Sequence, residues 1–444
     1  MDYVRSRYLL LGDKVYLDRL GRRASLAYSA RKATLFALDE ATADQLRRNA
    51  APPTPELAAV GAIVPRDEDE LGAVLAALRS GSDDPARRGF TILVTGYCNM
   101  ACGYCGQEHH RTAAQSERVA RLADRVEATI AGPATRDVEI TWFGGEPMLA
   151  LRLIKQLSAR FIAAAREHSV GYSARMATNG SLLTVATLAQ LHHDCHLNSM
   201  EVTIDGPQAV HDRRRLKRNG TGSYRHIVSV LGEAVRAQVA PKLEVSIRVN
   251  VDTDNEDSVS ELITDLAAHG LASPQVSLHP VPVHSWGNDI SAIEIDARRY
   301  AALEAQWLRQ AQSLGLRCAS LPTALKRTTC RATSVHGEIV DLHERVYSCS
   351  EHPLVPGMRD SGVVATVTDL AGSAPRPPGR YDGWYDQVGE DRVPCGRCPL
   401  LPVCGGSCPK LWDEGHLPCP SMRFNWADRL DLAAARLGYK AADG

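Results

Sequence analysis

The amino-acid sequence predicts an α/β protein in which a parallel, barrel-like sheet lies between a small α+β domain and a cysteine-rich C-terminal part. Strand and helix patterns alternate over six β units between residues 90 and 285, which is typical of parallel strands joined by right-handed crossovers. Eight of the twelve cysteines fall in two short stretches, 98–105 and 395–419. The first 85 residues contain no cysteine and no histidine, so we expect a separate domain there without metal chemistry.

The composition excludes several classes of protein. The 444 residues include 51 basic and 52 acidic side chains, a balance that predicts neither nucleic acid nor an anionic membrane as an obligate partner. No window approaches the roughly 20 uninterrupted apolar residues of a membrane span, and the charged N-terminal stretch lacks the features of a secretory signal. Twelve cysteines are too few for a disulfide scaffold, so we expect a cytoplasmic protein whose clustered cysteines bind metal.

Short strands followed by helices are expected in residues 1–85. The segments "YLLLG", "KVYLD" and "ASLAYSA" have strand character, whereas "TLFALDEATADQLRR" and "DEDELGAVLAALRS" carry apolar residues at helical spacing. The stretch "GSDDPARRG" that follows is typical of a linker.

The middle part predicts the sheet. Strands are expected at 90–96, 137–145, 172–180, 199–206, 243–252 and 274–281, with helices at 116–132, 148–168, 185–194, 223–238 and 258–270. The strands are nearly continuous in apolar residues, which predicts a sheet covered by helices. A cysteine triplet, "GGEP", "TNG" and "IDGP" follow the first four strands. Because chemistry gathers at the carboxyl ends of parallel strands, we expect these motifs at one mouth of the sheet.

Cys98, Cys102 and Cys105 form a CxxxCxxC triplet. A structural zinc ion requires four protein ligands, and this stretch supplies three. An iron–sulfur cube also takes four ligands, but one position can be left for a substrate or cofactor. A zinc ion with an open coordination position remains an alternative. Cys195 stands apart from both cysteine groups, and we interpret it as a buried structural thiol.

The triplet and the motifs after it resemble the radical S-adenosylmethionine (SAM) enzymes over residues 90–285. The resemblance implies a partial (β/α)6 TIM-like barrel and a [4Fe–4S] cluster that the three cysteines hold and SAM chelates. In that family, one electron from the reduced cluster cleaves SAM to methionine and a 5′-deoxyadenosyl radical, which abstracts hydrogen from an unactivated C–H bond. The resemblance therefore also implies an electron donor such as a flavodoxin or a ferredoxin.

The same resemblance implies the SAM-binding residues. "GGEP" corresponds to the strand end that binds the SAM amino group, with Glu146 as acceptor; by itself, a Gly-Gly turn before a surface acid explains this motif equally well. "TNG" and "TIDGP" correspond to segments near the ribose and the methionine ends of SAM, and "HDRRR" and "GTGSY" continue the match. Arg248 either binds the SAM carboxylate or forms a structural ion pair. The implied set is Gly144, Gly145, Glu146, Pro147, Thr178, Asn179, Thr203, Asp205 and Arg248.

The run "CGRCPLLPVCGGSC" adds a second signature. Its spacing, with further cysteines upstream, resembles the SPASM extension of radical SAM enzymes, which carries two auxiliary [4Fe–4S] clusters; a zinc ribbon is the alternative. When the ligand pattern of this extension is applied to this chain, the resemblance implies Cys395, Cys398, Cys404 and Cys419 as the ligands of the distal cluster. Those of the proximal cluster are Cys330, Cys349 and Cys408, with Cys318 or an open position as the fourth.

Two positions depart from the pattern. Where the SPASM pattern has glycine five residues before Cys349, this chain has Glu344. Where the sulfatase-maturing branch has an aspartate general base after that cysteine, this chain has Ser350, which argues against oxidation of Ser or Cys to formylglycine. The catalytic residues are therefore unknown. Side chains of this kind are more often structural than catalytic, and the loose candidates for a base are Glu351, His352, His279 and His284.

The substrate is inferred from the extra clusters and from the first 85 residues. Three clusters favour a net oxidation, because a cluster of suitable potential accepts the electron that a product radical must lose. Residues 1–85 loosely resemble winged-helix-like domains that bind the leader of ribosomally made precursor peptides by adding a strand to a sheet edge. We expect a peptide maturase that forms a thioether, C–C or C–heteroatom crosslink.

Several alternatives stay open. They are a capping domain without a partner at residues 1–85, a sulfatase-type maturase, a small-molecule oxidoreductase, and a non-enzymatic zinc or iron–sulfur scaffold. The predicted domains are 1–85 for peptide recognition, 86–290 for the barrel, 291–315 for a bridging helix and 316–444 for the SPASM part with a C-terminal helix. The basic run Arg213–Arg218 has the charge to steer an acidic leader, but we expect a solvated loop.

Overall fold

The computed structural model describes residues 2–50, 52–111 and 114–442, which form two compact units. The barrel unit contains residues 83–318 and 334–380, and the terminal unit contains residues 1–82, 319–333 and 381–444. The N-terminal residues therefore share a unit with most of the cysteine-rich part. The finer division into four functional domains stays a prediction. Within the described ranges, no helix is long and apolar enough to cross a membrane.

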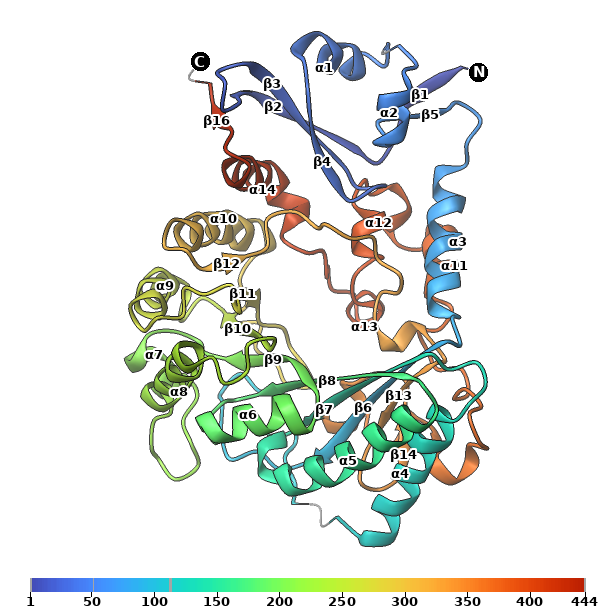
Figure 1. The fold of residues 1–444 in the computed structure, drawn as a ribbon, viewed down its shortest axis with the longest axis vertical. Coiled ribbons are helices and arrows are strands. Elements are labelled where there is room, and N and C mark those ends of the chain that lie inside the picture. The colour runs from blue at the N-terminus through green and yellow to red at the C-terminus, as the bar shows by residue number, and fades with distance from the viewer. Residues whose placement is uncertain (1, 51, 112–113, 443–444) are drawn as a thin grey trace. The chain divides into compact units, whose positions relative to one another are not determined.

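A ten-stranded sheet is the frame of the barrel unit (Figure 1). Its central six strands are parallel, which confirms the predicted β units. They are β6 (Arg87–Thr95), β7 (Asp137–Gly144), β8 (Gly171–Thr178), β9 (Leu197–Thr203), β10 (Glu244–Val251) and β11 (Val276–Pro282). At the two edges lie β12 (Arg317–Cys318) beside β11, and β13 (Gly337–Val340), β14 (Arg345–Tyr347) and β15 (Val363–Thr366) beyond β6. The strand order does not close on itself, so the barrel is partial.

Helices join the parallel strands at the five predicted places, and each of those five buries an apolar stripe. A further helix at Gln208–Arg214 was not predicted, and only His211 is buried in it. The helices of this unit are α4 (Ser116–Ile130), α5 (Leu151–Glu167), α6 (Val185–Asp194), α7 (Gln208–Arg214), α8 (Tyr224–Ala237), α9 (Val259–Ala268) and α10 (Ala297–Ser313). Short 3-10 turns occur at η1 (Pro147–Ala150), η2 (Glu256–Ser258), η4 (His352–Leu354) and η5 (Val367–Asp369). Helix α10 lies within the range predicted for a bridging helix.

The two faces of the central strands differ in polarity. Along β7 to β11, buried apolar residues alternate with polar residues that are partly exposed. Trp142, on the apolar face, stacks on Phe161 of α5 with 6.3 Å between the ring centroids, so this face lies under the helices. The opposite, inner face carries Arg175, Glu201 and Arg248. Strand β6 is buried along nearly its whole length, whereas β7 to β11 are apolar mainly on the outer face, where helices cover the sheet as predicted.

The terminal unit contains a sheet of order β16-β2-β3-β4. Its strands are β2 (Leu9–Leu17), β3 (Arg23–Ser29), β4 (Thr34–Leu38) and β16 (Lys440–Ala441), while β1 (Tyr3–Arg5) pairs with β5 (Ile63–Pro65). The helices are α1 (Glu40–Arg47), α2 (Pro55–Ala59), α3 (Glu70–Ser82), α11 (Trp384–Gly389), α12 (Leu401–Cys404), α13 (Pro409–Asp413) and α14 (Met422–Arg436), with 3-10 turns η3 (Arg331–Thr333) and η6 (Pro394–Arg397). One buried core joins the N-terminal sheet to the cysteine-rich tail; it includes Tyr8, Tyr28, Trp384, Val403 and Leu430.

One prediction for the N-terminal residues is confirmed and one is wrong. "YLLLG" and "KVYLD" have the predicted strand character and together form β2, whose pairing with β3 continues past an irregularity between Leu11 and Val15. Thr34–Leu38, expected to open a helix, forms β4 because its β-branched and aromatic side chains suit a pleated surface. The helix begins later, where the Asp39 carboxylate accepts a hydrogen bond from the Thr42 backbone N–H at 2.8 Å.

Glu344, the departure from the SPASM pattern, lies in the turn between β13 and β14. Its φ of 67° falls in the left-handed region, where a glycine is favoured and other residues cost roughly 1–2 kcal/mol. The Glu344 carboxylate accepts two hydrogen bonds from Arg121 of α4, at 2.5 and 2.9 Å. This ion pair ties the turn to the helix and offsets part of the backbone strain.

A buried carboxylate between two guanidinium groups fixes strand β13, which pairs with β6 and β14. Glu338 accepts hydrogen bonds from Arg88 of β6 at 3.4 Å and from Arg125 of α4 at 2.5 Å. Its side chain has no exposed surface. Arg125 also donates to the Ala374 carbonyl at 2.6 Å, so the cluster holds a loop as well as the strand.

Replacing this carboxylate is expected to destabilise the barrel unit strongly. Glu338→Gln leaves two buried guanidinium groups without a counter-charge, which costs about 3–5 kcal/mol. The matched control is Glu139→Gln, whose exposed pair with Arg175 (3.7 Å) contributes at most about 1 kcal/mol. Anaerobic urea unfolding of both variants measures the difference. Equal, small shifts of the two midpoints would show that the buried cluster does not stabilise the fold.

Candidate functional site

The three N-terminal cysteines lie on the loop after β6, which we call the thiol loop (residues 96–106). Cys98 is buried, and Cys102 and Cys105 are half-buried. Burial raises the pKa of Cys98 to about 11 and raises the pKa of the other two thiols as well. Met100 in the middle of the loop forms an antiparallel bridge with Lys217. The loop is therefore held in a fixed conformation beside the sheet.

Two glycines at the end of β7 lie directly against the thiol loop. Gly144 has a φ of 137°, and a Cβ atom on it would collide with the Thr95 carbonyl oxygen. A Cβ atom on Gly145 would lie 2.5 Å from the Tyr97 carbonyl. The Gly145 N–H donates to the Thr95 carbonyl at 3.1 Å. Only glycine permits this close backbone approach, which places the strand end beside Cys98.

Glu146 joins the ends of β7 and β8. One carboxylate oxygen accepts from the Met148 N–H at 2.9 Å and from the Thr178 hydroxyl at 2.7 Å. The other accepts from the Asn179 N–H at 2.7 Å. Glu146 has no exposed surface, so the alternative of a surface acid is wrong, and burial raises its pKa. A carboxylate has about four acceptor positions, so one remains for an ammonium group.

The "TNG" motif contacts the first thiol. The side-chain amide of Asn179 donates to the Cys98 sulfur at 3.7 Å and to the Asn99 side-chain oxygen at 2.9 Å. Thr178 and Asn179 are both buried. Pro147 opens the 3-10 turn η1 beside them and is buried too. The structure thus brings six predicted residues, Gly144 to Pro147 with Thr178 and Asn179, to the thiol loop.

Asp205 anchors the other end of the thiol loop. Its carboxylate accepts from the Asn250 N–H at 2.9 Å and from the Tyr104 hydroxyl, and it lies 3.5 Å from Arg215. Asp205 has no exposed surface. Its side chain therefore ties the loop to β10 through protein groups, and its predicted contact with SAM stays a prediction.

Arg215 is the functional residue that the sequence did not single out. Burial raises the pKa of Cys98, Cys102 and Cys105, and the positive charge of Arg215 opposes that effect on each of them. A nearby cation favours the thiolate, which is the form that binds metal. The run "HDRRR" contained the signal, but its spacing does not reveal which arginine is buried beside the thiols.

Arg248 and Thr203 lie on the inner face of the sheet. They are register partners on β10 and β9, and His279 of β11 is the next partner along. Arg248 donates to the Asn250 side-chain oxygen at 2.8 Å and lies 3.5 Å from the Glu201 carboxylate. His279 lies 3.8 Å from the same carboxylate. This geometry favours the ion-pair alternative for Arg248, and a third of its side chain remains exposed.

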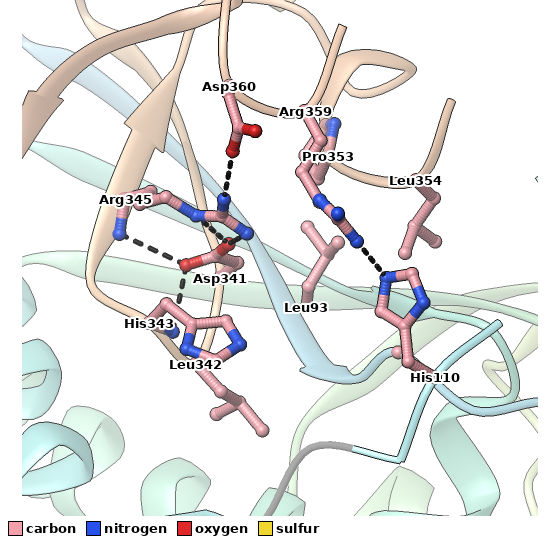
Figure 2. Close-up of a pocket in the computed structure, with 11 residues that line it drawn as sticks. Leu93, His110, Asp341, Leu342, His343, Arg345, Pro353, Leu354, Arg359 and Asp360 are labelled. Atoms are coloured by element: carbon pink, nitrogen blue, oxygen red, sulfur yellow. Dashed lines mark hydrogen bonds and ion pairs between the residues drawn. The ribbon is translucent and has the colours of Figure 1, made fainter. Parts of the chain in front are cut away.

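A cavity of about 300 Å³ opens next to the thiol loop (Figure 2). Its walls come from Leu93 and Gly96 at the end of β6, and from the β13–β14 turn and the segment after η4. Figure 2 shows Arg359 reaching across to the His110 ring, a contact of 2.7 Å. The size falls in the range of sites that bind small molecules or side chains, about 300–1,000 Å³.

The four cysteines predicted for the distal cluster surround one cavity in the terminal unit. Its thiol lining is Cys395, Cys398, Cys404 and Cys419. Burial raises the pKa of Cys395 to about 12, and the other three thiols add to the shift. Arg423 also lines the cavity, and its guanidinium donates to the Cys419 sulfur at 3.0 Å. The sequence did not single out Arg423.

The remaining cysteines are less clearly grouped. Cys330 and Cys408 both lie in the terminal unit, where Cys408 adds to the effect of desolvation in raising the pKa of Cys330 to about 11. Cys349 belongs to the barrel unit, so the predicted proximal set spans both units and stays a prediction. Cys318 is buried on β12, where its thiol donates to the Leu308 carbonyl at 3.5 Å. Cys195 is buried at the end of α6, as predicted.

The four candidate bases differ in position. Glu351 lies near enough to Cys105 to contribute to its raised pKa, after burial and nearer groups. His352 is buried within η4, and the His284 ring lies 6.4 Å from the Trp286 ring. His279 lies on the inner face of the sheet. The position of none of these four side chains links it to a substrate. The assignment of a base stays open.

The donor sets fit iron–sulfur clusters better than single ions. Among the described residues, no group of three or more Cys, His or carboxylate side chains converges closely enough to hold one metal ion. A [4Fe–4S] cluster places each thiolate on a different iron, so its ligands lie farther apart. The thiol loop supplies three such ligands and the distal cavity supplies four.

The glycine contact predicts a sharp effect on iron loading. Gly145→Ala places a methyl group against the Tyr97 backbone and displaces Cys98, so we expect it to lose the iron bound by the thiol loop. Iron analysis after anaerobic reconstitution measures this loss. Gly103→Ala is the matched control, because a Cβ atom there meets nothing within 4 Å. Equal iron content in the two variants would contradict the proposed role of the close approach.

Known proteins resemble the chain in sequence and fold. The serine-type anaerobic sulfatase-maturating enzyme of Klebsiella aerogenes is 22% identical over 327 residues, which cover 70% of this chain and 77% of that enzyme. The solved structure of anSMEcpe with bound AdoMet superposes with a TM-score of 0.55 at 14% identity, covering 79% of this chain and 98% of the other. SuiB of Streptococcus suis with its precursor peptide SuiA reaches 0.48 at 13% identity over 95% of this chain and 99% of SuiB, too low to establish a common fold.

The family model of the radical SAM superfamily matches residues 92–266. That range runs from the second half of β6 through β10 and contains the thiol loop and the motifs gathered around it. The family uses SAM and a [4Fe–4S] cluster, and a loop with three thiols and a vacant fourth position fits that cluster. The chain therefore contains a radical SAM domain, which indicates a radical SAM enzyme.

Proposed function

We propose that this radical SAM enzyme acts on a ribosomally made precursor peptide and forms an oxidative side-chain crosslink. SAM and its cluster supply a 5′-deoxyadenosyl radical that removes a hydrogen atom from the peptide. The protein positions the peptide, excludes water and provides a route for the electron that the product must lose. The bond formed is a thioether, a C–C bond or a C–heteroatom bond.

The observation that carries this proposal is the second set of thiols. Cys395, Cys398, Cys404 and Cys419 surround one cavity, in a unit separate from the thiol loop. Iron–sulfur potentials span roughly −700 to +450 mV, depending on ligands and surroundings. A cluster in this cavity is therefore a suitable electron acceptor. With a proximal cluster at Cys330, Cys349 and Cys408, the enzyme would contain three clusters.

A peptide substrate is supported by the inner face of the barrel. Its partly exposed Glu201, Arg248 and His279 lie on three adjacent strands and offer hydrogen-bonding groups to a peptide. The cavity beside the thiol loop offers a further site for a side chain. Among structures with this fold, anSMEcpe has been solved with AdoMet and the Kp18Cys peptide.

The N-terminal sheet supports binding of a leader peptide. Strand β4 is the last strand in its sheet, so among the described residues nothing pairs with its outer edge. The opposite edge is partly covered, because β16 pairs with Tyr16 and Leu17 of β2. An extended leader adds a strand most readily to the free edge at β4.

The chemistry is tested on the short peptides encoded beside the gene. The reconstituted enzyme, incubated with SAM and a reductant, is expected to remove two hydrogens from one of them, as measured by mass spectrometry. A crosslink also blocks fragmentation between the joined residues. The variant with Cys98, Cys102 and Cys105 replaced by alanine should leave the peptide unmodified.

A second candidate is supported by the similarity to a sulfatase-maturating enzyme. Oxidation of serine to formylglycine also removes two hydrogens, but it creates an aldehyde that a hydrazide captures. If a hydrazide captures the product and the peptide fragments normally, the enzyme forms formylglycine rather than a crosslink. Ser350, where that branch has an aspartate, favours the crosslink.

The leader site predicts a local change in hydrogen exchange. On adding the precursor peptide to the full chain, we expect slower amide exchange at Thr34–Leu38, because β4 gains a partner strand. Exchange in β3 should change little, since both of its edges are already paired. Mass spectrometry of deuterated peptides measures both. Protection confined to other segments would place the leader elsewhere.

A further inference from the structure

Arg423 lies at the mouth of the distal thiol cavity. It belongs to the first turn of α14, four residues after Cys419. Its guanidinium donates a hydrogen bond to the Cys419 sulfur at 3.0 Å. It is exposed, and among the described residues it forms no ion pair with a carboxylate.

Arg423 lies close to more than one thiol. Its side chain lines the same cavity as all four cysteines, and its guanidinium hydrogen-bonds to Cys419. The four thiols around the cavity therefore have this cation as a common neighbour. Several exposed arginines in this protein pair with Asp or Glu, as Arg22 and Arg23 do. Arg423 has sulfur in place of a carboxylate.

We propose that Arg423 raises the reduction potential of the cluster held by Cys395, Cys398, Cys404 and Cys419. The inference rests on the proposed function, which assigns a [4Fe–4S] cluster to this cavity. Reduction adds one negative charge to the cluster and leaves its bonds to the four thiolates in place. A cation and a hydrogen-bond donor at a ligand sulfur stabilise the reduced form more than the oxidised form.

The consequence is directional electron flow. The electron released by the product leaves most readily toward the cluster with the higher potential. Arg423 contacts a cluster ligand rather than the substrate. It therefore acts on the reaction through the potential of the cluster. Its exposed position also marks the side of the terminal unit on which the distal cavity meets solvent.

The test is a potentiometric titration followed by electron paramagnetic resonance. The enzyme carries Cys98→Ala, Cys102→Ala and Cys105→Ala, so that only auxiliary clusters contribute to the signal. Arg423→Met is expected to shift the potential of one cluster to more negative values, with the iron content and the other potential unchanged. Arg423→Lys, which keeps the charge but loses the planar donor, should give a smaller shift.

Arg436→Met is the matched control, because Arg436 lies on the last turn of the same helix. It should leave both potentials unchanged. An Arg423→Met enzyme with intact clusters and unshifted potentials overturns the inference about Arg423. A separate variant, with the four cavity cysteines replaced by alanine, tests the proposed function. If its iron content does not fall, no cluster occupies the cavity.

Discussion

The contact between the thiol loop and the two glycines at the end of β7 constrains the rest of the catalytic region. Because Gly144 and Gly145 have no side chains, the backbone of Thr95 to Cys98 passes directly against them. This contact brings the Glu146 carboxylate under the loop, where its three hydrogen bonds fix the end of β8. A cofactor bound at the loop therefore meets groups whose positions are set before it arrives, so less ordering remains to be done on binding.

The two faces of the central sheet have different roles: the outer face stabilises the fold, and the inner face is available for contacts. Its outer face is apolar and lies under helices, as the stacking of Trp142 on Phe161 illustrates. Its inner face carries charged side chains that neutralise one another, so it remains open without exposing unpaired charge. The same separation explains why substitutions on the two faces have different consequences: those on the outer face change packing, and those on the inner face change what the enzyme contacts.

Much of the barrel followed from local patterns. Strand and helix periodicity placed all six parallel strands, and the motif order placed the thiol loop beside "GGEP" and "TNG", because parallel strands end at one edge. Thr34–Leu38 was mistaken for a helix, since its strand character depends on pairing with β3, which the segment itself does not encode. Arg215 and Arg423 escaped notice for a related reason: their roles come from contacts with sulfur atoms, and no spacing rule distinguishes them from other arginines. Glu344 was flagged only as a departure, and its backbone angle explains why a glycine suits that turn.

The terminal unit is assembled from both ends of the chain. Its core joins Tyr8 and Tyr28 to Trp384 and Leu430, and the last described strand, β16, pairs with β2. A nascent chain emerging from the ribosome holds the first of these residues long before the others are synthesised. The apolar face of the N-terminal segment therefore stays uncovered until α14 has been translated. The distal cavity likewise needs Cys419 and Arg423, so a chain that ends before α14 has neither this cavity nor the pairing of β16 with β2.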